Sequence, residues 1–179
     1  MKRLLVSLCL IGLVAACTTR QTTDATTSAD SARTDSTAAT QATASAPLSA
    51  RLTALGLTTD HDWRQVTIGD PFTAAKITET SQPFEQDANH IGYTQEFANL
   101  ESVDYQYFQK GNKVSSIQVD FYLNSAGAVK AYQQELTAYL NARYGPVSGS
   151  AGTLSWKSGN VVLKDLSKGK DFGLKLTMK

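Results

Sequence analysis

The strongest pattern in the sequence is an alternation of apolar and polar residues between Lys113 and Leu123. Successive side chains of an extended chain point to opposite sides, so this alternation predicts a strand with one buried side. The apolar members of the series are Ile117, Val119, Phe121 and Leu123. Gly111-Asn112, just before it, is typical of a two-residue hairpin turn, and a partner strand is expected over residues 103–109.

The next pattern has the period of an amphipathic helix and covers residues 125–144. Its apolar residues recur every three or four positions: Val129, Tyr132, Leu136, Tyr139 and Leu140. Ser125 or Asn124 is expected to cap the first free amide groups. Gly145-Pro146 is expected to end the helix, because glycine readily adopts a left-handed conformation and proline cannot continue a helix.

Shorter segments complete the predicted folded part. Two short helices are expected over residues 47–56 and 71–78, the second capped by Asp70 and burying Phe72, Ala75 and Ile77. A polar loop is expected over residues 82–90, and further strands are expected over residues 63–68, 91–97, 154–156, 161–166 and 172–178. This order predicts an α+β domain over residues 48–179, an antiparallel sheet with two or three helices packed on one face.

Two further segments precede this domain. Residues 1–16 have the basic start, the short apolar run and the small closing residues of a secretory signal peptide. The apolar run is too short to span the hydrocarbon core of a bilayer comfortably. Residues 17–47 are mostly Thr, Ser and Ala and contain no aromatic residue. We expect them to form a disordered linker, since they cannot bury enough apolar surface to offset the entropy of ordering the backbone.

The segment Leu13-Val14-Ala15-Ala16-Cys17 resembles the lipobox of bacterial lipoproteins. The resemblance implies cleavage between Ala16 and Cys17, a diacylglyceryl group on the Cys17 thiol and an acylated N-terminus. Thr18 at the next position implies export to the outer membrane in Gram-negative lipoproteins. The expected localisation is therefore the cell envelope, lipid-anchored at the outer membrane and facing the periplasm or the cell surface. The alternative is ordinary signal cleavage near Ala16, which leaves Cys17 as a free thiol.

The overall composition and the candidate chemistry narrow the functional classes. The chain has 179 residues and a formal net charge of +1, which argues against a nucleic-acid binder. Its two cysteines, Cys9 and Cys17, cannot form a disulfide framework.

Candidate catalytic and metal-binding residues are few. Asp60-His61-Asp62 and the loop with Glu85, Asp87 and His90 lack the spacing of a zinc site, and both histidines are expected at the solvated surface. Ser167-Lys168-Gly169-Lys170 fits a Ser-x-x-Lys pattern but lies in a polar turn without the partner motifs. We therefore expect no catalytic residue, no metal and no cofactor.

Two groups of residues are candidates for a partner surface. The lysines of the last hairpin are Lys164, Lys168, Lys170 and Lys175, and the tyrosines expected to point outward are Tyr105, Tyr107 and Tyr122. Clustered lysines suit an acidic partner, a glycan or lipid headgroups, and tyrosine is common in interface cores. The alternatives are a solvated strand face whose lysines protect the sheet edge, and tyrosines that pack against the second face of the sheet.

A second resemblance concerns the folded part. Ile68-Gly69-Asp70-Pro71 precedes a short helix and then strands with aromatic residues. This arrangement is similar to small periplasmic modules of the BamE-type outer-membrane assembly lipoproteins and of the β-lactamase inhibitor proteins. A helix followed by strands with an aromatic residue occurs twice along the chain. No site residue is carried over from this resemblance.

These observations predict a membrane-anchored envelope lipoprotein whose small α+β domain is a non-enzymatic protein-interaction or scaffold module. The expected partners are the membrane, through the lipid anchor, and an envelope protein, but no nucleic acid; the oligomeric state stays open. The alternatives are a small-ligand or glycan-binding lipoprotein and, as a third class, a hydrolase.

Replacing Cys17 by serine tests the anchor. The Cys17→Ser variant is expected to lose palmitate labelling and to move from the membrane to the soluble fraction, because two or more acyl chains are needed for stable anchoring. The control is Cys9→Ser, which removes the other thiol within the predicted leader and is expected to leave labelling unchanged. Membrane retention of Cys17→Ser equal to that of the wild type contradicts the anchor.

Overall fold

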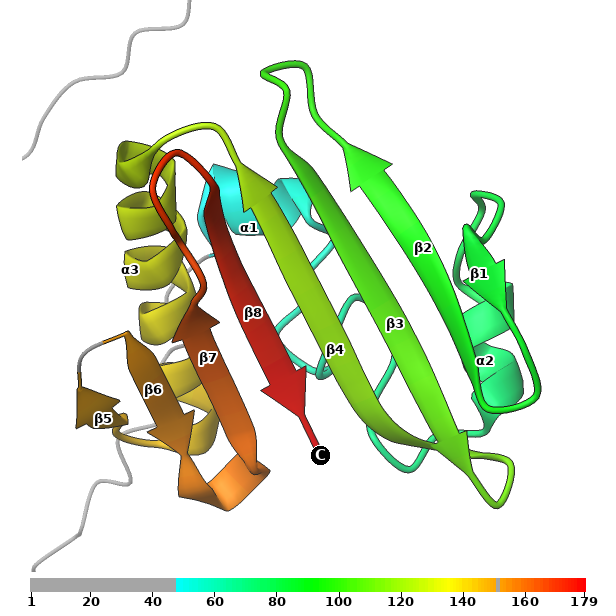
Figure 1. The fold of residues 1–179 in the computed structure, drawn as a ribbon. Helices are drawn as coiled ribbons and strands as arrows, with labels where there is room; N and C mark the ends of the chain where they lie inside the picture. The colour runs from blue at the N-terminus through cyan, green and yellow to red at the C-terminus, as the bar shows by residue number, and fades with distance from the viewer. Residues whose placement is uncertain (1–47, 151) are drawn as a thin grey trace, which may run out of the picture. The chain divides into compact units, whose positions relative to one another are not determined.

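The computed structural model describes residues 48–150 and 152–179. They form an α+β unit with helices packed on an eight-stranded antiparallel sheet, as the sequence predicts (Figure 1). The predicted signal peptide over residues 1–16, Cys17 and the predicted linker over residues 17–47 lie outside the described residues.

Most predicted elements are confirmed within one residue. The helical segments are α1 (Ala50–Ala54), α2 (Phe72–Ile77), α3 (Ala126–Tyr144) and the 3-10 turn η1 (Lys157–Gly159). The strands are β1 (Glu85–Gln86), β2 (His90–Glu96), β3 (Ser102–Lys110), β4 (Lys113–Leu123), β5 (Ser148–Ser150), β6 (Thr153–Trp156), β7 (Val161–Asp165) and β8 (Phe172–Met178). The two short strands β1 and β5 have no counterpart in the prediction.

The sheet consists of two four-stranded meanders. Its strand order is β1-β2-β3-β4-β8-β7-β6-β5. The last strand of the first meander, β4, therefore pairs with the last strand of the second, β8, in the middle of the sheet (Figure 1). α1 and α2 precede the first meander, and α3 precedes the second. The repeated order of helix and strands is therefore present in the structure.

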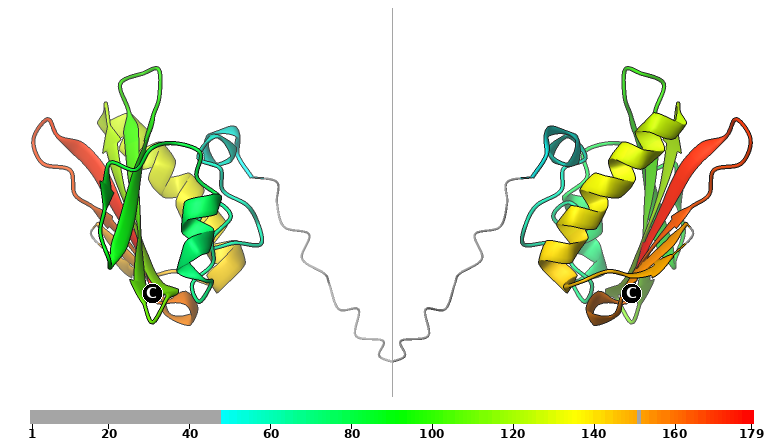
Figure 2. Two further views of the ribbon diagram at one scale, coloured as in Figure 1. Left: turned by 90° about the vertical axis from the view of Figure 1, so that its right-hand side faces the viewer. Right: turned by 90° about the vertical axis from the view of Figure 1, so that its left-hand side faces the viewer.

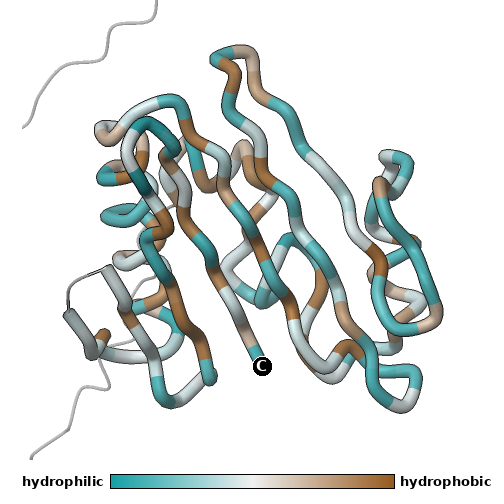
Figure 3. The backbone as a smooth tube through the Cα atoms, in the orientation of Figure 1, coloured by the Kyte–Doolittle hydropathy of each residue, from teal (hydrophilic) through white to brown (hydrophobic). Residues whose placement is uncertain are grey.

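The core lies on one side of the sheet. In the antiparallel pairing of β4 with β8, Val119 is opposite Leu176 and Phe121 is opposite Leu174, and all four side chains are buried. Brown apolar and teal polar positions alternate along these strands in Figure 3. Both views of Figure 2 show the helices together on one side of the sheet. α3 buries its predicted residue Leu136.

The ends of α3 are as predicted. The Ser125 hydroxyl accepts a hydrogen bond from the Ala128 N–H at 3.1 Å, which satisfies one of the free amide groups of the first turn. Gly145 follows the last helical residue with a φ of 81°, a left-handed value that a residue without a Cβ adopts at little cost.

The predicted strand over residues 63–68 is wrong. Here the chain makes a tight turn, with an isolated bridge between Trp63 and Val66 and a positive φ of 55° at Arg64. Both apolar residues are buried. The apolar pattern therefore predicted their burial correctly, but its prediction of an extended strand was wrong.

Two predictions for α2 are also wrong. The Asp70 carboxylate does not cap the helix but accepts the Thr67 N–H at 2.7 Å, within the preceding turn. Ile77 is 79% exposed, because this six-residue helix buries only the side that carries Phe72 and Ala75.

Tyr105 and Tyr107 are buried, so the prediction that they point outward is wrong. They share the inner side of β3 with Val103. Their hydroxyl groups donate to the buried carboxylate of Glu79 at 2.8 and 3.0 Å, and Arg64 Nε pairs with the same carboxylate at 2.9 Å. Burial, together with the Glu79 carboxylate, raises the pKa of both tyrosines above the value of free tyrosine. This Glu79 cluster joins the segment after α2 to the sheet.

Removing one hydroxyl tests the Glu79 cluster. Tyr107→Phe is expected to lower the free energy of unfolding by about 1.5–3 kcal/mol, because a buried carboxylate loses a donor. The matched control is Tyr122→Phe. Tyr122 is 54% exposed, so the loss of its hydroxyl is expected to change the free energy of unfolding by close to zero. Urea unfolding of both variants gives the comparison, and equal stability of Tyr107→Phe and wild type contradicts the role of the cluster.

Candidate binding groove on the open face of the sheet

The side of the sheet opposite the helices carries a row of polar side chains across six strands. Figure 1 looks onto this open face, with the helices behind the sheet. The strand registers place the members of the row directly opposite one another, in the order Thr94, Asp104, Asp120, Lys175, Lys164 and Thr153. One half of the row is therefore acidic and the other half is basic.

Hydrogen bonds hold the acidic half of this row. Asp104 and Asp120 lie opposite each other on β3 and β4, where like charges are unfavourable. Each carboxylate has its own partner: the Thr94 hydroxyl donates to Asp104 at 2.6 Å, and Lys175 Nζ pairs with Asp120 at 3.2 Å. Gln118 also donates to Asp120, at 2.9 Å. The two carboxylates are thereby satisfied within the sheet.

The basic half of the row borders a groove of about 680 Å³. Four lysines line this lysine groove: Lys157, Lys164, Lys175 and Lys179. Ser155, Val162 and Thr177 lie between them on the open face, and no acidic side chain is among the lining residues. Within the described part of the chain, Lys164 takes part in no ion pair. The groove therefore offers ammonium groups and hydroxyls to a ligand that carries carboxylate or phosphate groups.

The structure divides the four lysines named from the sequence into two pairs. Lys164 and Lys175 are direct neighbours across β7 and β8 and line the groove. Lys168 and Lys170 are exposed in the turn between these strands and do not line it. Their turn and the end of β8 lie at opposite ends of the hairpin (Figure 1).

The sequence interpretation missed two residues of the groove. Lys179 continues the period of two that starts at Lys175 and Thr177, so the alternation in the last strand already indicated its side of the sheet. Lys157 had no such signal, because it lies in the 3-10 turn after β6 rather than on a strand.

Tyr122 is the one tyrosine of the three predicted that lies exposed on the open face. It is opposite Gly173, whose carbonyl accepts the N–H of the exposed Leu166. Partial burial, and next the carboxylates of Asp104 and Asp120, raise the pKa of Tyr122, so its hydroxyl stays protonated at neutral pH. Tyr122 thus adds an aromatic ring beside the charged row.

His61 is partly exposed, but the prediction of a solvated surface position is wrong for His90, whose side chain is only 14% exposed and stacks on the ring of Phe108. His61 Nδ1 lies 2.9 Å from Asp60, and His90 lies within 3.3 Å of Glu85 and 3.0 Å of Asp87. Across residues 48–150 and 152–179, no group of three or more His, Cys, Asp or Glu side chains is arranged to hold a metal ion.

None of the helices in these ranges has the length and hydrophobicity of a membrane span. Ser167 lies in the turn before β8, where its hydroxyl accepts the Gly173 N–H at 3.3 Å.

No family model, curated protein or solved structure matches the chain. The resemblances to bacterial lipoproteins and to the small periplasmic modules therefore stay predictions from the sequence.

Proposed function

We propose that the chain is a lipid-anchored envelope lipoprotein whose folded domain is a non-enzymatic interaction module for an acidic segment of an envelope protein. The observation that supports this function is the lysine groove on the open face of the sheet. Four lysines surround it without an acidic lining residue. A concentration of one charge in a concave surface attracts the opposite charge and speeds association.

The spacing of the lysines favours an extended protein segment as the occupant. Lys175, Thr177 and Lys179 follow one another at every second position at the end of the chain. The two lysines are four residues apart, about 13.6 Å along a strand, and every second acidic residue of an extended peptide with glutamate at alternate positions has the same repeat. Lys164 lies beside Lys175 on the neighbouring strand, so a segment running along β8 meets a further positive charge from β7.

The predicted anchor and linker fit this role. Acylation of Cys17 would keep the domain at the membrane, and a disordered linker of about 30 residues has a root-mean-square span of roughly 30 Å. The domain would then search for a partner within a limited distance of the bilayer. Tethering of this kind raises the effective concentration of the module near envelope proteins.

Charge reversal inside and outside the groove tests the proposed function. Lys164→Glu/Lys179→Glu reverses two groove lysines and leaves the Lys175–Asp120 ion pair intact. Lys168→Glu/Lys170→Glu makes the same change in net charge in the turn of the same hairpin. Binding is measured with a labelled peptide that has glutamate at alternate positions, and with its glutamine counterpart as the uncharged probe. In-cell crosslinking of the same variants shows whether envelope partners depend on the same residues.

The wild type is expected to bind the glutamate peptide in a salt-sensitive manner, because exposed charges are screened by added salt. The groove variant is expected to bind about tenfold more weakly or worse, whereas the turn variant stays within about threefold of the wild type. Equal losses in both variants would indicate only a general charge effect and would refute the groove. Equal binding of the glutamine peptide would refute the electrostatic basis.

A further inference from the structure

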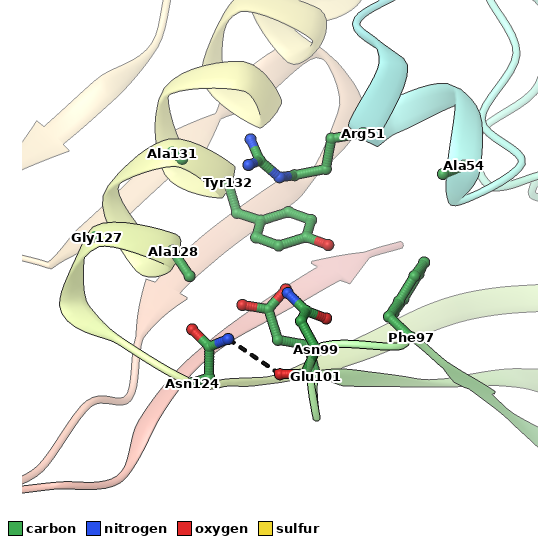
Figure 4. A pocket seen from close by; sticks show the side chains of 10 residues that line it. All are labelled: Arg51, Ala54, Phe97, Asn99, Glu101, Asn124, Gly127, Ala128, Ala131 and Tyr132. Atoms are coloured by element: carbon green, nitrogen blue, oxygen red, sulfur yellow. Dashed lines mark hydrogen bonds between the residues drawn. The ribbon is translucent and has the colours of Figure 1, made fainter.

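A second hollow lies where α3 begins, among side chains from α1, α3 and the turn between β2 and β3. Its volume is about 440 Å³, and it shares no residue with the lysine groove. Figure 4 shows Glu101 directed into it beside the ring of Tyr132, with Asn99 and Asn124 on either side. We call this hollow the Glu101 pocket.

Glu101 is a largely buried residue whose carboxylate lines the pocket and has no partner in the described part of the chain. The residue is only 6% exposed, yet no hydrogen bond or ion pair joins its side chain to any residue in the ranges 48–150 and 152–179. The other buried acidic residues differ in this respect: Glu79 accepts two hydroxyl groups and pairs with Arg64. A carboxylate in such a largely buried position is stabilised by any donor or cation that enters the pocket.

Arg51 is the one cationic side chain among the lining residues, and it is paired with a carboxylate other than Glu101. Arg51 forms an ion pair with Glu135, and its guanidinium lies 4.9 Å from the centre of the Tyr132 ring. Figure 4 shows Glu101 beside this ring, and burial first, and then the charge of Glu101, raises the pKa of Tyr132. Two carboxylates therefore face one arginine around Tyr132, and one negative charge is left without a counter-charge.

We propose that the Glu101 pocket binds the protonated primary amine of a small ligand with a short apolar body. An ammonium group has three donors, and the Glu101 carboxylate supplies the negative charge it needs. The Asn124 amide nitrogen donates to the Asn99 carbonyl at 3.1 Å, which leaves the Asn124 amide oxygen as a further acceptor. The small side chains of Ala54, Ala128 and Ala131 leave room for methylene groups beside the polar end.

This site goes beyond the proposed interaction function, since it takes a ligand of the opposite charge at a separate place. The competing explanation is structural: the N-terminus of α3 carries a partial positive charge and stabilises a nearby carboxylate without any ligand. The two explanations differ in whether the pocket discriminates a cation from a neutral molecule of the same size. The test is built on this difference.

The experiment is an NMR titration of the full chain in detergent with n-butylammonium, n-butanol and butyrate as probes. Only n-butylammonium is expected to shift the backbone amide signals of Gly127, Ala128 and Ala131, which line the pocket. Glu101→Gln is expected to weaken this binding about tenfold or more, since the charged hydrogen-bond acceptor is lost. The matched control Glu96→Gln removes one negative charge from the exposed end of β2 and is expected to bind as the wild type does.

A second titration uses Nα-acetyl-lysine amide, which carries the same ammonium on a protein-like side chain. Stronger binding of this probe than of n-butylammonium identifies a lysine of a protein as the source of the amine, and the reverse order identifies a free amine. Equal shifts with n-butanol, or no shift with either amine, overturn the proposal in favour of the structural role. These outcomes come from titrations of the wild-type protein and do not need the variant. The proposal can therefore be tested even if Glu101→Gln fails to fold. The lysine-groove variants are expected to bind n-butylammonium normally, so the two proposals fail or succeed separately.

Discussion

The pairing of β4 with β8 is the constraint on which the rest of the structure depends. It is the junction between the two meanders, with seven residue pairs in antiparallel register. In this register Val119 is opposite Leu176 on the inner side, while Asp120 is opposite Lys175 on the outer side. A slip by one residue would move every side chain of one strand to the other face and would bury a lysine against the helices. The same register therefore determines both the core and the charge pattern of the open face.

The inner side shows how the two halves share one core. α3 precedes the second meander, yet Tyr132 from this helix packs against Phe121 of β4, with ring centres 5.4 Å apart. The segment between α1 and α2 reaches back to α3, where the Asp62 carboxylate accepts hydrogen bonds from Tyr144 and Arg143. Although burial acts in the opposite direction, the bonds from Tyr144, Ile68 and Arg143 lower the pKa of Asp62. The halves are thus joined by packing, by strand pairing and by buried polar contacts.

The sequence predicted the elements well where a local period carried the information. The strand over residues 113–123, the strand over residues 172–178 and the end of the long helix at Tyr144 agree with the structure, because alternation, helical spacing and Gly145 are local signals. The side of β3 that is buried was not predicted correctly. Val103 is apolar, but tyrosine is amphipathic, and only the distant Glu79 provides the buried partner that lets Tyr105 and Tyr107 lie inside.

The two candidate sites show the same limit. Lys164 and Lys175 were found because they alternate with apolar neighbours on strands. The position of Lys175 opposite Asp120, however, follows from the pairing of β4 with β8, strands that are about 50 residues apart in sequence. Glu101 could not be distinguished from the other acidic residues of its region. Its burial arises only when α1, α3 and the β2–β3 turn come together. Candidate chemistry that depends on such distant contacts has no local pattern.

Under the proposed function, the charge row would let the open face bind a partner without losing stability. Lys175 is engaged with Asp120, so a partner that takes Lys175 must replace an existing ion pair and gains little from it. Lys164 is exposed, and the described ion pairs do not include it, so its charge is available at no such cost. The junction of β4 and β8 therefore keeps its cross-strand ion pair, while the strands beyond it supply the free positive charge. This division places the unpaired positive charge on the half of the sheet farther from the acidic carboxylates, so the proposed acidic segment would be directed away from Asp104 and towards β7.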